Sequence, residues 1–402
     1  MPDNRLETRK SFPMQRKIHF LDGLRGIAAF YVMAGHARWL LWEGFNEGYL
    51  KNGHLYSSVD KLCMYFLSLF KWGHEFVLFF FVLSGFVIHL GYAKKLTADP
   101  EVKISIKEYL YKRIKRIYPP FLFAIFLTAL LDFIGSKYGF SIYSGDTPYS
   151  SINKQIGNTS HSISTLFGNI LFLFPEYVPR FGTNGPTWSL KFEWWFYILY
   201  IPFLFMSRKN IYLSTGLVVL LFVVSFFPGI WPVAILQTIF SSMLCWWFGV
   251  LIAEVVAGRL KIPLLYLTGA FLVGFVGLFL FKSRLDIADL RTAFFFSALL
   301  SFFLWYNNKE YSLRLLERLK PLGDFSYTLY IIHFPILVFL SGIILKINNN
   351  YLPRHSWYVF AGMVVCIVIA YLCYFLVEVP FMKPLKSGSE ARKKKDVSAV
   401  GS

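Results

Sequence analysis

The first residues of this sequence that could do chemistry are Arg25 and His36, which lie eleven positions apart in the apolar segment Ile18–Trp42. At about 100° per residue, eleven positions of an α-helix come to roughly three turns, so both side chains leave nearly the same face, about 16 Å apart. Ionisable groups in a membrane span commonly face the protein interior or a wet cavity. Two interpretations stay open. Arg25 and His36 belong to a functional site, or Arg25 extends to the lipid headgroups and His36 is a hydrogen-bonded packing residue.

A pair of arginines forms the second candidate, Arg113 and Arg116 in the stretch RIKRIYPP. Side chains at positions i and i+3 share one helix face, and paired guanidinium groups hold phosphate through two parallel hydrogen bonds each. The pair could therefore bind a nucleotide or the diphosphate of coenzyme A. The alternative is a positively charged membrane anchor that binds no ligand.

Glu193 is the third candidate, in the aromatic stretch GPTWSLKFEWWFY. A carboxylate among aromatic side chains requires a partner, and residues two apart on a helix do not face each other, so Lys191 is a poor one. We expect Glu193 to orient a histidine or to bind a sugar hydroxyl. Among these groups His36 is the one whose imidazole can take a proton from a hydroxyl near neutral pH.

Other polar residues in apolar segments have a structural interpretation first. Ser84 in FFFVLSGF favours close helix packing over a nucleophile, because the GxSxG motif is absent. His333 and Glu378 could be hydrogen-bonding residues without a role in a site. The four cysteines show no CxxC spacing and no clustering with other metal ligands, so we predict inert thiols and no metal: Cys63, Cys245, Cys366 and Cys373.

The composition and the apolar segments predict which secondary-structure elements position these groups. The chain has 402 residues, of which 56% are apolar and 16% charged, too little polar surface for a soluble globule of this size. Crossing the hydrocarbon layer takes about 20 apolar residues in a helix. We predict an all-α integral membrane protein with ten spans, at about 21–42, 74–92, 117–135, 186–206, 211–228, 231–256, 262–282, 290–306, 325–347 and 356–381.

Basic residues give the orientation. They concentrate in both tails and in every second connection, whereas the opposite side holds only Lys51, Lys61, Lys71, Lys137, Lys154, Arg180, Arg284 and Arg354. Because cytoplasmic loops carry the excess of Lys and Arg, we expect both termini to lie in the cytoplasm. We expect the protein itself in a cell membrane, a bacterial inner membrane or a plasma membrane. The net charge of +18 thus reflects topology, and we expect no nucleic-acid partner.

The expected organisation has three parts. Residues 1–17 form a cytoplasmic tail, residues 18–384 the membrane domain, and residues 385–402 a disordered basic tail, with no fused soluble domain. Two exterior connections, about 43–73 and 136–185, are long enough to hold structure. The second is rich in Ser, Asn, Gly and Thr, which suits a sugar-rich acceptor and equally an ordinary surface loop.

Six motifs in order resemble the acyltransferase-3 family of membrane O-acyltransferases: LDGLRGIAAFYVMAGH, FFFVLSGF, RIKRIYPP, GPTWSLKFEWWFY, FSYTLYIIHFPI and VEVPF. The resemblance extends from about Phe20 to Pro384. The arginine and histidine of the family's first motif fall on Arg25 and His36, and its cytoplasmic RxxR falls on Arg113 and Arg116. The family's tryptophan-rich glutamate falls on Glu193.

The resemblance implies transfer of an acyl group, usually acetyl, from cytoplasmic acyl-coenzyme A to a hydroxyl of a cell-surface or lipid-linked glycan. His36 and Glu193 would be catalytic, with His36 a general base or an acyl carrier, and Arg25, Arg113 and Arg116 would bind the coenzyme. The family often ends its last span with Glu-Arg-Pro-Phe, and Val379 stands where the arginine is expected, so Glu378 receives no site role.

A secondary transporter or a lipid-linked glycan flippase is the alternative from another class. Such proteins commonly show inverted repeats and paired broken helices, and the sequence shows neither. A glycan polymerase or ligase is a further alternative, for which we would expect a large exterior loop rich in arginine. The loop at 136–185 carries little charge.

Overall fold

The structure, a computed structural model, describes residues 18–157, 159–280, 287–309, 311 and 313–382. Nearly all of its regular structure is helical. The exception is a short parallel pair of strands, β1 (Thr159–Ser160) and β2 (Arg180–Phe181). The two tails and Arg284 lie outside the described residues, although their basic residues were counted in predicting the orientation.

Ten described helices coincide in position with the ten predicted segments. They are α1 (Phe20–Leu40), α4 (Gly73–Ala98), α5 (Ile106–Lys137), α9 (Trp188–Lys209), α10 (Ile211–Val224), α11 (Ala234–Val256), α12 (Leu264–Leu280), α13 (Ala288–Asn308), α16 (Ser326–Ile347) and α17 (Trp357–Val377). By length and composition, six of them can cross a membrane: α4, α5, α11, α13, α16 and α17. The chain is therefore an all-α, multi-pass membrane protein. Helices α10 and α12 are apolar but shorter.

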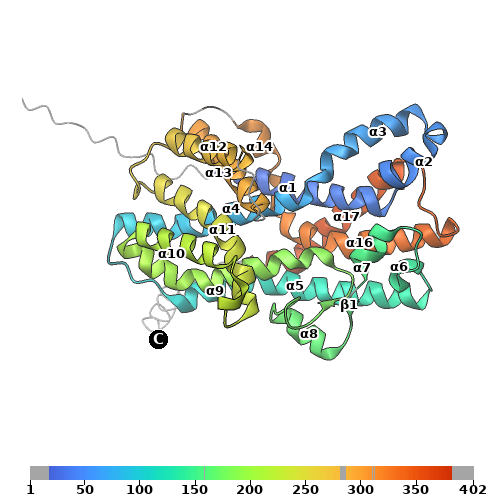
Figure 1. The fold of residues 1–402 in the computed structure, drawn as a ribbon, viewed down its shortest axis with the longest axis horizontal. Coiled ribbons are helices and arrows are strands. Elements are labelled where there is room, and N and C mark those ends of the chain that lie inside the picture. Colours follow the sequence, from blue (N-terminus) through green and yellow to red (C-terminus); the bar gives the residue numbers. More distant parts are fainter. Residues whose placement is uncertain (1–17, 158, 281–286, 310, 312, 383–402) are drawn as a thin grey trace, which may run out of the picture.

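Short helices fill the two long connections. The first holds η1 (Gly44–Tyr49), α2 (Leu50–Asn52), η2 (Gly53–Leu55), α3 (Ser58–Ser68) and η3 (Leu69–Lys71), and the second holds α6 (Ser141–Ser144), α7 (Ser150–Ile156), α8 (Ile163–Ile170) and η4 (Gly185–Thr187). Helices α2, α3, α6 and α7 gather at the right-hand end of the molecule in Figure 1. We call this the short-helix end. The remaining short elements are η5 (Pro228–Ile230), α14 (Arg314–Arg318), α15 (Lys320–Asp324) and α18 (Val379–Met382).

Helix α5 is longer than its predicted span. Its 32 residues amount to about 48 Å, against about 30 Å of hydrocarbon. A search for apolar residues detects the segment from 117 onward, whereas the helix already starts at Ile106, where the hydroxyl of Ser105 accepts a hydrogen bond from the Glu108 amide. Arg113 and Arg116 therefore lie on one continuous helix, about two turns and one turn before Pro119 respectively.

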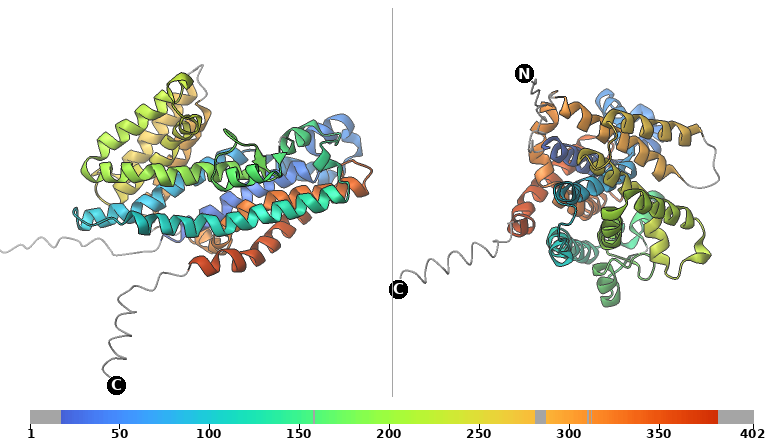
Figure 2. Two further views of the ribbon diagram at one scale, coloured as in Figure 1. Left: turned by 90° about the horizontal axis from the view of Figure 1, so that it is seen from below. Right: turned by 90° about the vertical axis from the view of Figure 1, so that its left-hand side faces the viewer.

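Close backbone packing joins α4 to α11. A methyl group added to Gly85 would come within 2.0 Å of the Trp246 carbonyl oxygen, and one added to Gly249 within 2.0 Å of the Val82 carbonyl oxygen. Only glycine fits this crossing, which confirms the interpretation of close helix packing for Gly85. Figure 2 shows α10 to α13 lying together as a group that is inclined to the long helix α5. Helix α1 packs against α4, α16 and α17.

Candidate functional site

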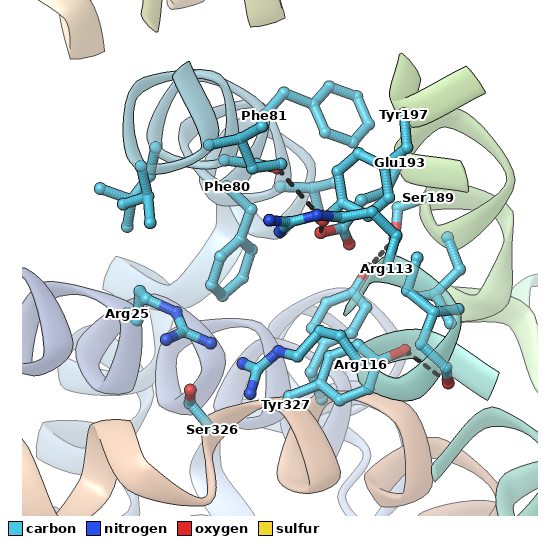
Figure 3. Close-up of a pocket in the computed structure, with 18 of the residues that line it drawn as sticks. Arg25, Phe80, Phe81, Arg113, Arg116, Ser189, Glu193, Tyr197, Ser326 and Tyr327 are labelled. Carbon is cyan, nitrogen blue, oxygen red and sulfur yellow. Dashed lines mark hydrogen bonds between the residues drawn. The ribbon is translucent and has the colours of Figure 1, made fainter. Parts of the chain in front are cut away.

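Three arginines point into one cavity of about 300 Å³, the arginine cavity, which is lined by residues of α1, α4, α5, α9 and α16. Figure 3 shows the guanidinium groups of Arg25, Arg113 and Arg116 converging on the open space, with Glu193 and Tyr197 beside it. The structure thus brings together four of the five predicted site residues. Lys112 also lines this cavity with a side chain that is 53% exposed, which indicates an opening at the start of α5.

Aromatic rings hold Arg113 in place. The central carbon of its guanidinium group lies 5.5 Å from the ring centres of both Tyr109 and Tyr197. This arrangement is a cation–π contact on two sides, and it fixes the plane of the guanidinium group. The Nε atom of Arg113 is buried without a hydrogen-bond partner among the described residues. Arg113 is therefore oriented by rings, while its hydrogen-bonding capacity stays available to a ligand.

A buried carboxylate holds Arg116. Its guanidinium group donates to Glu378 at 3.3 Å, and the other carboxylate oxygen of Glu378 accepts hydrogen bonds from the amide and the hydroxyl of Thr328. The Glu378 side chain is 2% exposed, and the Tyr327 ring lies 5.4 Å from the Arg116 guanidinium carbon. Glu378 thus aims Arg116 at the cavity, a positioning contact that sequence analysis missed because it judged the motif by Val379.

Glu193 also belongs to the arginine cavity. Its carboxylate accepts a hydrogen bond from the hydroxyl of Tyr197, one turn further along α9. It makes no hydrogen bond to His36 in the described part of the chain. Of the two roles expected for Glu193, orienting the histidine is therefore not what the geometry favours. Ser84 lines the same cavity and accepts from the Trp246 indole at 3.3 Å.

His36 lies on a second cavity of about 450 Å³, the histidine cavity. Its walls come from the end of α1, from η3, from the start of α4 and from the segment that leads into α9, on the side of the short-helix end. Val77 and Tyr330 line both cavities, so the two spaces meet at these side chains. The shared wall separates His36 from Arg25, Arg113 and Arg116.

The partner of His36 is a second histidine. The Nδ1 atom of His36 lies 3.0 Å from Nε2 of His333, and Nδ1 of His333 lies 3.1 Å from the Leu329 carbonyl oxygen. A carbonyl only accepts, so Nδ1 of His333 carries a proton, and in a neutral pair its Nε2 accepts from His36 Nδ1. This assignment leaves Nε2 of His36 with a free lone pair. Sequence analysis left His333 without a role.

Tyr330 is fixed within the shared wall. Its hydroxyl lies 2.7 Å from the Ser189 hydroxyl and 3.3 Å from the Pro186 carbonyl oxygen, at the start of α9. Tyr330 and Val77 are both buried, at 5% and 3% exposure. The wall is therefore a packed constriction between two helices.

A buried aspartate holds the segment between Arg180 and Gly185, two residues that line the histidine cavity. Asp132 is 1% exposed and accepts from the amide and the hydroxyl of Thr183, at 2.9 and 2.7 Å, and from His161 at 2.9 Å. The hydrogen bond to Asp132 raises the pKa of His161 above its ordinary value near 6.5, and burial opposes it. Asp132 lies within a predicted span, a signal that sequence analysis did not use.

Comparison with known proteins agrees with this architecture. The model of the family described as "Acyltransferase domain" matches residues 18–375. Fold and match together define a multi-pass membrane acyltransferase. The chain belongs to the acyltransferase-3 family.

An uncharacterized protein of Haemophilus influenzae is 31% identical over 134 residues, which cover 33% of this chain and 49% of the relative. The chain thus spans about half the length of this curated relative. No solved structure matches. Within the described ranges no group of three or more His, Cys, Asp or Glu could hold a metal ion. The roles of Arg25, His36, Arg113, Arg116 and Glu193 stay predictions.

Proposed function

We propose that this protein transfers an acyl group, acetyl in the simplest case, from cytoplasmic acyl-coenzyme A to a hydroxyl of a glycan at the outer face of the cell membrane. Family membership supplies the reaction class. The observation that carries the rest is the pair of cavities that share Val77 and Tyr330, one with three arginines and one with a histidine pair. Each cavity suits one substrate.

The arginine cavity suits the donor. The phosphates of the coenzyme would bind Arg113 and Arg116 at the cytoplasmic start of α5, with Arg25 on the opposite wall. Tyrosine rings and Glu378 already orient these two guanidinium groups. The uncharged arm of the coenzyme would then lie along the apolar part of the cavity, with its thioester at the shared wall.

The histidine cavity suits the acceptor. Nε2 of His36 takes the proton of the acceptor hydroxyl as the hydroxyl oxygen attacks the thioester carbonyl carbon. The new carbon–oxygen bond replaces the carbon–sulfur bond, and the coenzyme leaves as a thiolate that receives the proton. His333 holds His36 in the required tautomer and stabilises the charged imidazolium through the hydrogen bond at Nδ1. Glu193 would act on the donor side, near the leaving sulfur.

Incubation of the purified protein with acetyl-coenzyme A labelled in the acetyl group tests the proposal. Label should pass into the glycan fraction, and His36→Ala should lower this transfer about 10²- to 10⁴-fold while the protein still accumulates in the membrane. His54→Ala, at an exposed histidine of the first long connection, is the matched control and should transfer normally.

Label that stays on the coenzyme with the unaltered protein would contradict the proposal and favour a transporter. Transfer that continues unchanged in His36→Ala would remove His36 from the mechanism. Label that becomes covalently bound to the protein, and is absent in His36→Ala, would indicate that His36 carries the acyl group itself.

A further inference from the structure

Three basic side chains line the histidine cavity together with His36. They are Arg38 from the last turn of α1, Lys71 from η3 and Arg180 from β2. No Asp or Glu is among the described residues that line this cavity. The cavity that would receive the acceptor hydroxyl is therefore positively charged.

Within the described residues, these three cations form no ion pair with an acidic side chain. Arg38 forms no hydrogen bond or ion pair within the described structure, and its Nε atom is buried. The Lys71 ammonium lies 5.0 Å from the Trp72 ring centre, and Arg180 donates only to the backbone oxygens of Gly182 and Gln155.

The carboxylates nearby are engaged elsewhere. Asp132 accepts from Thr183 and His161, Asp289 lies 2.8 Å from His74, and Glu43 accepts from Tyr56. None of them is within ion-pair distance of Arg38, Lys71 or Arg180, as judged over the described residues. The cations of this cavity are therefore not paired with a described carboxylate. Asp132 acts on Arg180 at longer range, and Glu43 and Glu47 line the adjoining cavity.

Neighbouring cations without an ion-pair partner are unfavourable in a partly buried space, and a bound anion relieves their repulsion. Guanidinium groups bind carboxylate and phosphate through paired hydrogen bonds, and an ammonium group binds the same anions as a point charge. Trp39 and Trp188 line the same cavity and offer broad apolar surfaces for the ring of a sugar.

We infer that the histidine cavity binds an acidic sugar, with a carboxylate or phosphate held by Arg38, Lys71 and Arg180 close to the hydroxyl that His36 addresses. The inference rests on the proposed function for the identity of the acceptor. It adds the chemical class of that acceptor, a glycan with an anionic group next to the acylated position.

Equilibrium dialysis of the purified full chain, without acyl donor, tests the inference. The probes are radiolabelled methyl glucoside, which is neutral, methyl glucuronide, which carries a carboxylate, and glucose 6-phosphate. At least one anionic probe should bind about tenfold or more tightly than the neutral one, and the preference should weaken as salt is added.

Four variants locate the binding. Arg38→Gln should weaken anionic binding about tenfold, and Arg38→Lys should recover part of the loss. Lys71→Gln, at an exposed side chain whose replacement leaves packing intact, should weaken it several-fold. Lys137→Gln removes an exposed charge at the end of α5, outside this cavity, and should change nothing.

Equal binding of all three probes would overturn the inference, and so would a preference that persists in both Arg38→Gln and Lys71→Gln. A preference for one anionic probe over the other supports the inference and tells carboxylate from phosphate. Because no acyl donor is present, a failure of acyl transfer does not affect this result. Transfer of label to a strictly neutral glycan would support the proposed function and contradict the acidic acceptor.

Discussion

The arginine cavity and the histidine cavity both collect positive charge, but the protein treats these charges differently. In the arginine cavity, Arg116 is held by the buried carboxylate of Glu378 and Arg113 by two tyrosine rings. In the histidine cavity, Arg38 and Lys71 have no acidic partner within the described ranges. The same type of side chain is thus oriented in advance on one side and unpaired on the other.

This difference indicates which interactions would supply the binding energy for the donor and for the acceptor. Groups that are oriented before binding lose little freedom when the ligand arrives, so geometry supplies much of the affinity for a donor of constant structure. Unpaired cations gain mostly from the charge of the ligand, and this gain is screened by salt when the cavity is open to water. We therefore expect salt to weaken acceptor binding more than donor binding.

The largest expected effect comes from removing the oriented arginines of the arginine cavity. Replacing both Arg113 and Arg116 by Gln should raise the KM for acyl-coenzyme A about 100-fold or more, because each charged hydrogen bond contributes about 1.5–3 kcal/mol, and kcat should change much less. Steady-state kinetics with the purified variant measures this change. Lys107→Gln, on the exposed face of α5, is the control. An equal loss of folded protein would show an anchor without a ligand.

The second largest effect is expected from blocking the passage between the two cavities at the shared wall. Val77→Phe should lower acyl transfer about 10- to 100-fold, because the larger side chain would narrow the passage. The added volume in a packed wall should also destabilise the fold by about 1–3 kcal/mol. Binding of the coenzyme and of the anionic sugars, measured separately, should persist. Val77→Ala should keep transfer and accept longer acyl chains. If Val77→Phe transfers acetyl at the normal rate, the two cavities are not joined at this position.

The histidine pair gives a smaller effect. His333→Ala should lower kcat about tenfold, since one hydrogen bond that holds the tautomer of His36 is worth about 0.5–1.5 kcal/mol. His333→Gln keeps an acceptor for His36 Nδ1 and should recover part of the rate. The pH–rate profile distinguishes positioning from structure, because loss of the hydrogen bond to His36 should move its acidic limb whereas simple unfolding should leave its shape unchanged.

The smallest effect concerns the contact between His161 and the buried Asp132. His161 has a raised pKa in the folded protein, so its ion pair with Asp132 stabilises the fold fully below pH about 6.5 and is lost as the pH rises through the folded value. The His161 side chain is 48% exposed, so the gain is below about 1 kcal/mol. Thermal unfolding at pH 6 and pH 8 should show a larger fall in Tm for the natural protein than for His161→Gln. Equal falls would exclude this contact as a source of pH dependence.

The helices could be predicted from the sequence because apolar length is a local property. Each predicted segment overlaps one long described helix, and the membrane-spanning class follows from composition. Where the prediction fell short, as at the start of α5, the cause is physical. The first turns of that helix are polar and are stabilised by the Ser105 cap, so a search for apolar residues does not detect them.

The partners within the site could not be predicted in this way. His36 and His333 are 297 positions apart, and helical periodicity does not tell which helices become neighbours. For the same reason sequence reasoning could not choose between a histidine and a sugar hydroxyl as the partner of Glu193, and it did not foresee the hydrogen bond from Tyr197. Grouping Arg25 with Arg113 as donor ligands depended on the resemblance to a family, and the structure brings them to one cavity.

The shared wall of Val77 and Tyr330 has an electrical consequence. If the acyl group alone passes this wall, the phosphates of the donor stay on the cytoplasmic side and the anion of the acceptor stays outside. Moving one elementary charge across a membrane at 100 mV involves about 2.3 kcal/mol of electrical work, and an acetyl group carries no charge. Only the proton that travels from acceptor hydroxyl to thiolate would feel the membrane potential, and an inside-negative potential would draw it in the productive direction.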